Sequence, residues 1–257
     1  MQKFHIPSYS QSHFGTQHIL ISLLFLIFVS ISLMARFSTY TLLEDGRLLP
    51  LVESFYTIQG EGFHTGEAAF FIRLGGCDVG CSWCDAKETW NPQLFPPVPI
   101  ERIVEGALEC QAKSVVITGG EPMNYPLDRL CAALKENGLK IFLETSGSAP
   151  LSGTFDWICL SPKRNAPPRE EFFPLADELK VIIEEHTDFI WAEENKEKII
   201  AASKQRASVR GWAEPCYFFL QPEWSRMKVV MPQVIEYVKG NPTWCISLQS
   251  HKFMNIP

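Results

Sequence analysis

The chain has 257 residues, of which 46% are hydrophobic and 20% charged, a composition that fits one mid-sized globular domain with a full core and excludes a disordered chain. Its 29 acidic side chains outnumber 23 basic ones, and the net charge of -6 argues against a protein that grips nucleic acid through the phosphates. The 8 cysteines are too few for a disulfide scaffold, and three of them fall between Cys77 and Cys84, which suggests a metal site in a reducing compartment.

The first segment of the chain differs from the rest. Ile19–Ala35 is an uncharged apolar run that approaches the length of a membrane span and exceeds the usual core of a signal peptide. Three explanations stay open: a start assigned upstream of the true one, a membrane anchor, and a cleaved signal peptide. We favour the first, because the sequence from Met34 reads as ordinary soluble sequence and export would put the cysteines in an oxidising space. We therefore expect residues 1–33 to be an extension without function, and residues 34–257 to be one cytoplasmic domain.

Beyond Leu51, strand-like and helix-like segments alternate without an internal repeat. Phe70–Leu74 is a short apolar run followed by turn glycines, which is typical of a strand. Apolar residues at helical spacing predict a helix over Ile100–Leu108, with Pro99 in its first turn. The β-branched run Ser114–Thr118 predicts a second, buried strand.

The second half of the chain continues this alternation. A helix over Leu127–Leu134 stops at Asn137-Gly138, and further helices are expected over residues 188–203 and around Pro232, which would occupy a first turn or a kink. The remaining strands are expected at residues 141–145, 157–161, 179–183, 217–221 and 245–249. This pattern predicts an α/β fold with a mostly parallel sheet. Because no strand is followed by a dinucleotide-type glycine loop, we favour an incomplete TIM-like β/α barrel over a doubly wound sheet.

Polar residues follow the carboxyl ends of several expected strands. In a parallel sheet these ends converge on one edge, where active sites are usually found. We therefore expect a functional rim at that edge, formed by Thr118–Glu121, Glu144–Gly147, Ser161–Lys163, Glu184-Glu185, Gln221 and Gln249.

The cysteine cluster has the spacing C-x3-C-x2-C, formed by Cys77, Cys81 and Cys84. Structural zinc normally takes four ligands in two distant pairs, whereas the other five cysteines are scattered. Three thiolates on one tight loop suit an iron–sulfur cluster in which one iron lacks a protein ligand and can bind a chelating molecule. We favour the iron–sulfur cluster over zinc, which stays open as the alternative.

At this point the motifs carry a family resemblance. The three-cysteine spacing resembles the signature of the radical S-adenosylmethionine (SAM) enzymes, and Gly119-Gly120-Glu121-Pro122 resembles their GGEP element. Further stretches resemble the 7-carboxy-7-deazaguanine synthase family over nearly all of residues 51–257: Glu53–Gly62, Phe71–Leu74, Trp83-Cys84-Asp85, Leu143–Gly147, Ser161-Pro162-Lys163 and Ser247–Lys252.

The resemblance implies both the fold and a reaction. It implies a partial barrel and the conversion of 6-carboxy-5,6,7,8-tetrahydropterin to 7-carboxy-7-deazaguanine with loss of ammonia, a step toward queuosine and other deazapurines. In that family a SAM-derived radical takes a hydrogen from the pterin, the ring contracts, and the hydrogen is returned. The resemblance also implies a homodimer and an external electron donor such as flavodoxin or ferredoxin.

The resemblance further implies roles for individual residues. The three cysteines would hold a 4Fe-4S cluster. SAM would be bound by Trp83, Cys84, Asp85, Gly120, Glu121, Ser161, Pro162 and Lys163. The pterin would be bound by Ile58, Gln59, Gly60, Glu61, Arg73, Thr118, His251 and the terminal carboxylate of Pro257.

Physical chemistry is consistent with parts of this assignment. Gln59 and Glu61 can read the amide and guanidine-like edge of a pterin through paired hydrogen bonds. An arginine inside an apolar strand, such as Arg73, needs an anionic partner, and a substrate carboxylate would provide one.

One residue departs from the family pattern. Ala86 follows Trp83-Cys84-Asp85, where many members of the family have a threonine or serine that ligates magnesium. Alanine offers no side-chain oxygen, so the Mg2+ implied by the resemblance would be held less tightly or ligated differently, by Asp85, substrate oxygens or water.

Two other functions remain as alternatives. A glycyl-radical-activating enzyme shares the cysteine spacing but acts on a protein. A zinc-stapled binding module, tethered to a membrane through Ile19–Ala35, would contain no iron and would ignore SAM.

Overall fold

The computed structural model describes Leu43 and residues 45–210 and 215–257. The chain divides into two units, Met1–Leu42 and Leu43–Pro257, and the described residues all belong to the second unit. The apolar run Ile19–Ala35 and the expected start at Met34 lie outside the described residues. Within the described part of the chain, no helix is long and apolar enough to cross a membrane.

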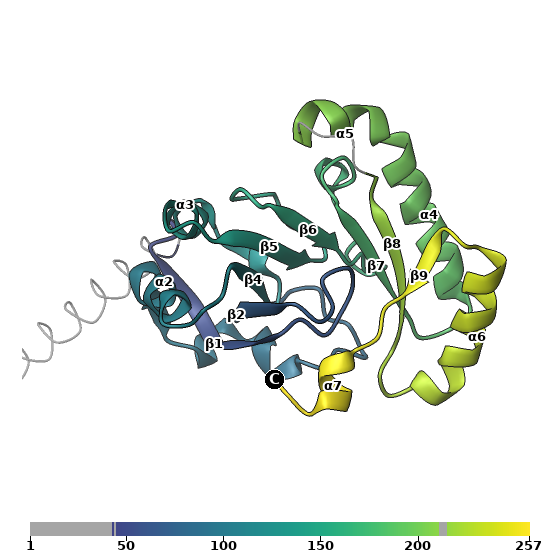
Figure 1. The fold of residues 1–257 in the computed structure, drawn as a ribbon, viewed down its shortest axis with the longest axis horizontal. Coiled ribbons are helices and arrows are strands. Elements are labelled where there is room, and N and C mark those ends of the chain that lie inside the picture. The colour runs from purple at the N-terminus through teal and green to yellow at the C-terminus, as the bar shows by residue number, and fades with distance from the viewer. Residues whose placement is uncertain (1–42, 44, 211–214) are drawn as a thin grey trace, which may run out of the picture. The chain divides into compact units, whose positions relative to one another are not determined.

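A single open sheet of nine strands dominates the described residues (Figure 1). The strand order is β3-β1-β2-β4-β5-β6-β7-β8-β9. From β2 to β9 all neighbours are parallel, whereas β1 pairs antiparallel with both β2 and β3. The strands are β1 Leu48–Ile58, β2 Ala68–Leu74, β3 Pro97–Pro99, β4 Ser114–Gly119, β5 Lys140–Thr145, β6 Trp157–Leu160, β7 Glu178–Ile183, β8 Tyr217–Pro222 and β9 Trp244–Ile246.

Helices cover the outer face of this sheet, so that the architecture is an incomplete β/α barrel, as the alternation predicted. In Figure 1, α2 and α3 flank the β1–β5 half, and α4 and α6 flank the β7–β9 half. The helices are α2 Ile100–Leu108, α3 Asp128–Glu136, α4 Thr187–Ala201, α5 Ser203–Arg210, α6 Met227–Gly240 and α7 Ser250–Met254, with 3-10 turns η1 Lys87–Trp90, η2 Pro92–Leu94, η3 Pro122–Asn124 and η4 Glu170–Phe172.

The core lies between the sheet and these helices. Ile103 and Ala107 of α2 lie four residues apart and are both buried, as are Leu130 and Leu134 of α3. Each helix therefore presents one apolar stripe, and burying a side chain such as leucine contributes about 2 kcal/mol. Trp244 of β9 is also fully buried and is among the largest of the buried side chains.

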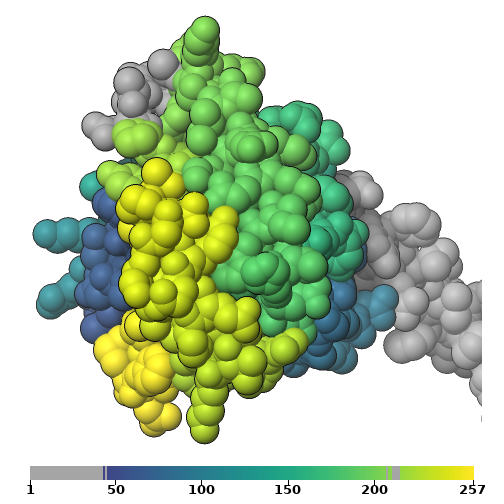
Figure 2. Space-filling model, turned by 90° about the vertical axis from the view of Figure 1, so that its right-hand side faces the viewer, coloured from purple at the N-terminus to yellow at the C-terminus, as the bar shows by residue number. Residues whose placement is uncertain are grey.

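Helices α4 and α6 pack against each other beside the second half of the incomplete barrel. The rings of Phe189 and Tyr237 stack with centroids 4.3 Å apart, and Tyr237 donates a hydrogen bond of 2.8 Å to Glu193. Trp244 donates to the same carboxylate at 2.7 Å. Figure 2 shows this side of the molecule, where the yellow-green residues of α6 lie against the green ones of α4.

Two details differ from the sequence predictions. The last strand ends at Ile246 rather than at residue 249. The amide of Ser247 still donates to Leu220, but by Ser250 the chain has begun α7 and bonds Gly60 instead. Pro232 lies inside α6, beyond its first turn, so the first-turn alternative is wrong. The helix expected over residues 188–203 is α4, and a second helix, α5, follows it.

Candidate active site

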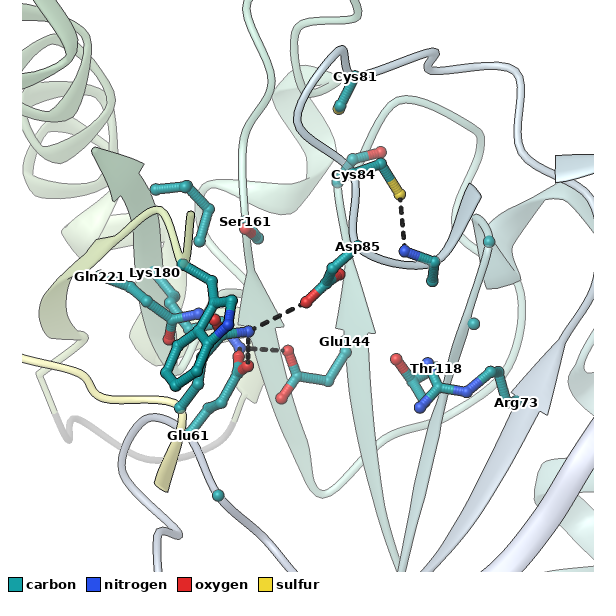
Figure 3. Close-up of a pocket in the computed structure, with 18 of the residues that line it drawn as sticks. Glu61, Arg73, Cys81, Cys84, Asp85, Thr118, Glu144, Ser161, Lys180 and Gln221 are labelled. Carbon is teal, nitrogen blue, oxygen red and sulfur yellow. Dashed lines mark hydrogen bonds and ion pairs between the residues drawn. The ribbon is translucent and has the colours of Figure 1, made fainter. Parts of the chain in front are cut away.

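A pocket of about 280 Å³ opens at the carboxyl ends of the parallel strands. Figure 3 shows Cys81 and Cys84 at one end, Glu61 and Lys180 at another, and Asp85 between them. Every residue to which the family resemblance gave a role lines this pocket, except Pro162. Of the expected rim, Gly147, Glu184 and Glu185 also lie outside it, and the amides of the two glutamates donate to Asp188 instead. The backbone oxygen of Pro162 instead accepts a hydrogen bond of 3.4 Å from the indole of Trp191, which fixes the segment that carries Lys163.

The cysteine loop follows β2 and is held against the turn that follows β4. The amide of Gly120 donates to the oxygen of Leu74, and the amide of Glu121 donates to the oxygen of Gly76, both at 2.8 Å. A Cβ on Gly119 would collide with Leu74, and one on Gly120 would collide with Gly76. The paired glycines are therefore required because two backbones touch here.

The three thiols of this loop face the same pocket and are half-buried. Burial raises the pKa of Cys77 and Cys81, although backbone N–H groups of Val79 and Gly80 act to lower the first and the Lys163 charge acts to lower the second. Among the described residues, no three His, Cys, Asp or Glu side chains are close enough to hold a single metal ion. The donor set, three thiols on one loop with N–H groups directed at sulfur, fits an iron–sulfur cluster.

Glu121 ties the turn after β4 to the end of β5. Its carboxylate accepts hydrogen bonds from Met123 N at 3.0 Å, from the Thr145 hydroxyl at 2.5 Å and from Ser146 N at 2.8 Å, and also from the Ser146 hydroxyl. The side chain is 1% exposed, so four donors satisfy a buried charge. Glu121 therefore positions the turn, and the backbone at Gly120 remains at the pocket surface.

Lys163 places a cation beside the cysteine loop. Its ammonium donates to the backbone oxygen and the hydroxyl of Ser161 at 2.6 and 2.7 Å, and lies 5.7 Å from the centre of the Trp83 ring. Burial lowers the pKa of Lys163.

The other end of the pocket contains a buried ionic group. The Lys180 ammonium lies 2.7 Å from Glu61 Oε2 and 2.7 Å from Glu144 Oε2. Burial acts to lower the pKa of Lys180, but the surrounding carboxylates outweigh it and raise that pKa well above its usual value. Burial likewise acts to raise the pKa of Glu61, and Lys180 outweighs it, which lowers the pKa to about 2. Both side chains are thus charged, and their geometry is fixed.

Amide side chains extend this group. Gln59 donates to Glu144 Oε1 at 3.3 Å, and Gln249 donates to Glu61 Oε1 at 2.9 Å. Behind it, Glu178 accepts from the amide of Phe63 at 3.1 Å, and burial raises its pKa to about 7. The hydrogen bond from Phe63 to Glu178 therefore anchors the loop that carries Glu61 to β7.

Arg73 lies apart from this group, next to Thr118 (Figure 3). The Arg73 Nε is paired with Glu53 Oε1 of β1 at 2.8 Å, so the protein itself supplies an anionic partner for this arginine. Within the described residues its terminal guanidinium nitrogens have no partner. They remain available for a planar anionic group in the pocket.

The C-terminal tail completes the wall. The amide and the hydroxyl of Ser250 both donate to the oxygen of Gly60 at 2.9 Å. A Cβ on Gly60 would collide with His251, so this glycine allows α7 to lie directly on the loop. Pro257 then lines the pocket, and its backbone oxygen accepts from the Thr57 hydroxyl at 3.3 Å.

Glu144, Gln221 and Gln249 line the pocket, as expected for the functional rim, although the sequence indicated no individual role for them. Lys180 is a pocket residue that sequence reasoning missed. A lysine inside the apolar run Leu179–Ile183 was a usable signal, by the same logic that singled out Arg73.

Comparisons with known proteins identify the family of this chain. The Radical SAM superfamily model matches residues 71–158. The chain is 49% identical to the 7-carboxy-7-deazaguanine synthase of Flavobacterium psychrophilum, over 83% of this chain and 95% of that one. It is 32% identical to the enzyme of that name from Escherichia coli, over 80% and 98%. The crystal structure of QueE from Escherichia coli aligns with a TM-score of 0.61 at 29% identity, over 81% of this chain and 96% of the other. The chain belongs to the 7-carboxy-7-deazaguanine synthase family of radical SAM enzymes.

Proposed function

We propose that this chain converts 6-carboxy-5,6,7,8-tetrahydropterin to 7-carboxy-7-deazaguanine with loss of ammonia, a step of queuosine biosynthesis. The observation that carries the proposal is a single pocket whose walls contain the cysteine loop, the turn at Gly120, and the Glu61–Lys180 group. Names of relatives at up to 49% identity support it. The catalytic unit in this proposal is residues 34–257.

Cys77, Cys81 and Cys84 would hold a 4Fe-4S cluster whose remaining iron takes SAM. The reduced cluster together with bound SAM would supply the one-electron chemistry that abstracts a hydrogen atom and begins the reaction. The electron would come from a small donor such as flavodoxin or ferredoxin, and the chain would act as a homodimer.

The residues near the cysteine loop would orient SAM. Lys163 offers a cation for its carboxylate, Trp83 an aromatic surface, and the backbone at Gly120 hydrogen-bonding groups. Asp85, Ser161, Pro162 and the Glu121 turn complete this part of the proposal. Holding SAM and the pterin in one pocket fixes the distance over which a hydrogen atom must move.

The opposite wall would bind the pterin. Gln59 and Glu61 present an amide and a charged carboxylate to its guanidine-like edge, beside the backbone of Ile58 and Gly60. Arg73, with Thr118, would hold the substrate carboxylate through its terminal nitrogens. His251 and the Pro257 carboxylate would close the site and exclude water.

The proposal includes Mg2+ only as a weakly bound ion. Ala86 supplies no side-chain ligand, and Oδ2 of Asp85 is already paired with Lys252, so that only Oδ1 of this carboxylate lacks a partner among the described residues. These residues do not fit a tightly held Mg2+.

The test is anaerobic reconstitution with iron and sulfide, followed by incubation with carboxytetrahydropterin, SAM and a reductant. We expect mass spectrometry to detect 7-carboxy-7-deazaguanine. If SAM is cleaved while the pterin is unchanged, the proposed substrate is wrong and the activase alternative gains support. A colourless protein that binds zinc would overturn the reaction class as well.

A further inference from the structure

Ala86 itself offers no free oxygen to a metal ion. The carbonyl oxygen of Ala86 accepts two hydrogen bonds, from the Thr89 amide at 3.0 Å and from the Thr89 hydroxyl at 2.7 Å. The amide of Ala86 donates to Cys84 Sγ at 3.4 Å. Thr89, the nearest hydroxyl along the chain, is 1% exposed and directed inward. Neither a side chain nor a free carbonyl is therefore offered at this position.

A lysine already occupies the neighbourhood of Asp85. Lys252 Nζ lies 2.7 Å from Asp85 Oδ2, and the same nitrogen donates to Gln249 Oε1 at 3.0 Å. It also lies 4.9 Å from the centre of the Trp224 ring. The Lys252 side chain is 20% exposed, so carboxylate, amide and aromatic surface hold its charge in one place.

Lys252 fixes the orientation of Gln249 and reaches the substrate wall through it. Because Gln249 Oε1 accepts from Lys252, its Nε2 must face the other way, where it donates to Glu61 at 2.9 Å and to Asp85 at 3.2 Å. Asp85 lies in the pocket, and its carboxylate points across it toward the Glu61–Lys180 group (Figure 3). A charge at Lys252 is therefore connected to the carboxylate that would read the pterin.

A hydrated Mg2+ would compete poorly with this arrangement. It requires octahedral oxygen ligands, whereas Asp85 Oδ2 already accepts two hydrogen bonds and Gln249 Oε1 accepts one. Entry of a divalent ion beside Asp85 would also place it close to the Lys252 ammonium, and the two like charges would repel each other.

We propose that no Mg2+ is held beside Asp85 in this chain, where the Lys252 ammonium supplies the positive charge, so that turnover needs no added Mg2+. Lys252 is then a positioning residue, which orders Asp85 and Gln249 for the substrate. The inference rests on the proposed function and concerns the same pocket.

The test compares turnover of the reconstituted wild-type chain in divalent-free buffer and in buffer with Mg2+. We expect kcat/KM to be the same, and we expect added Mn2+ to keep the electron paramagnetic resonance signal of the free aqueous ion in the presence of SAM and substrate. A strict requirement for Mg2+, or binding of one Mn2+ per chain, would overturn the inference.

Variants sharpen the comparison. Lys252→Met should raise KM for the pterin by about 10-fold, since a hydrogen-bonded charge is lost, and Lys252→Arg should restore most of it. The double variant Ala86→Thr with Lys252→Met should bind Mn2+ and respond to Mg2+. Lys239→Met, which removes an exposed pair with Glu236 on α6, is the matched control and should behave as wild type.

The outcomes separate the two proposals. Product that forms only with Mg2+ leaves the proposed function intact and contradicts the role of Lys252, as would a Lys252→Met variant indistinguishable from Lys239→Met. Absence of product in every buffer, with an intact cluster and SAM cleavage, contradicts the proposed function itself and with it the inference that rests on it.

Discussion

The ammonium of Lys180 lies 2.7 Å from the carboxylate of Glu61, although 119 residues separate them in the sequence. Lys180 comes from a buried strand and Glu61 from the loop after β1, so the ion pair joins two walls of the pocket. It sets the position of a charged group that the proposed reaction needs.

Lys180→Met should therefore damage both stability and binding. The substitution leaves Glu61 and Glu144 buried without their cation, which costs about 3–5 kcal/mol. Urea unfolding should show this loss, and KM for the pterin should rise. Lys135→Met, which removes a half-exposed pair with Asp156, should cost less than about 1 kcal/mol. Equal losses in the two variants would contradict a special role for the buried pair.

Gly120→Ala should disturb the cysteine loop. Its Cβ would meet the backbone oxygen of Gly76 and approach Cys77, so the loop must move, at a cost of about 1–3 kcal/mol. We expect a lower iron content after reconstitution, together with reduced visible absorbance. Gly240→Ala, at a position with open space and no positive φ, is the control and should load iron normally. Full loading of Gly120→Ala would show that the close approach is unimportant.

Arg73→Lys should weaken pterin binding more than it weakens SAM binding. Lysine retains the charge but loses the planar fork that can hold a carboxylate while also meeting Glu53. KM for the pterin should rise about 10-fold or more. The affinity for SAM, measured by calorimetry, should not change. Arg102→Lys, at an exposed pair on α2, is the control. If Arg73→Lys instead lost affinity only for SAM, the proposed contact between Arg73 and the pterin carboxylate would be wrong.

Glu178 should make stability depend on pH. Burial raises its pKa to about 7 in the folded chain, from a usual value of 4.5. The folded state therefore holds an extra proton between these values, and this contribution to stability is complete below pH 4.5 and disappears as the pH rises through about 7. The loss amounts to about 3 kcal/mol.

Glu178→Gln should remove most of that slope when urea unfolding is measured across the same pH range. His251 acts in the opposite direction, because burial lowers its pKa, so the difference between variant and wild type isolates Glu178. Parallel curves for the two proteins would contradict a raised pKa at Glu178.

Much of the fold could be predicted, because most of its strands are apolar runs that need no distant information. Phe70–Leu74 and Ser114–Thr118 lie within β2 and β4. The antiparallel pairing of β1 with β3 could not be predicted, because β3 is a three-residue strand with prolines at both ends. The strand expected to continue to residue 249 ends at Ile246, because the chain then forms α7 against Gly60, a contact between residues 190 positions apart.

The candidate site was predictable where motifs are local. The cysteine loop could be identified from its spacing and the turn at Gly120 from its resemblance to the GGEP element, and both line the pocket. The partners of Lys180 and Lys252 could not, because the ion pairs with Glu61 and Asp85 join residues more than a hundred positions apart. Such pairs depend on how the barrel brings its loops together.

The most direct test is to quantify 7-carboxy-7-deazaguanine, ammonia and 5′-deoxyadenosine after anaerobic turnover of the reconstituted chain with carboxytetrahydropterin, SAM and a reductant. We predict equal amounts of deazaguanine and ammonia, in excess of the SAM consumed, since the hydrogen is returned. Accumulation of 5′-deoxyadenosine with the pterin unchanged would contradict the proposed reaction.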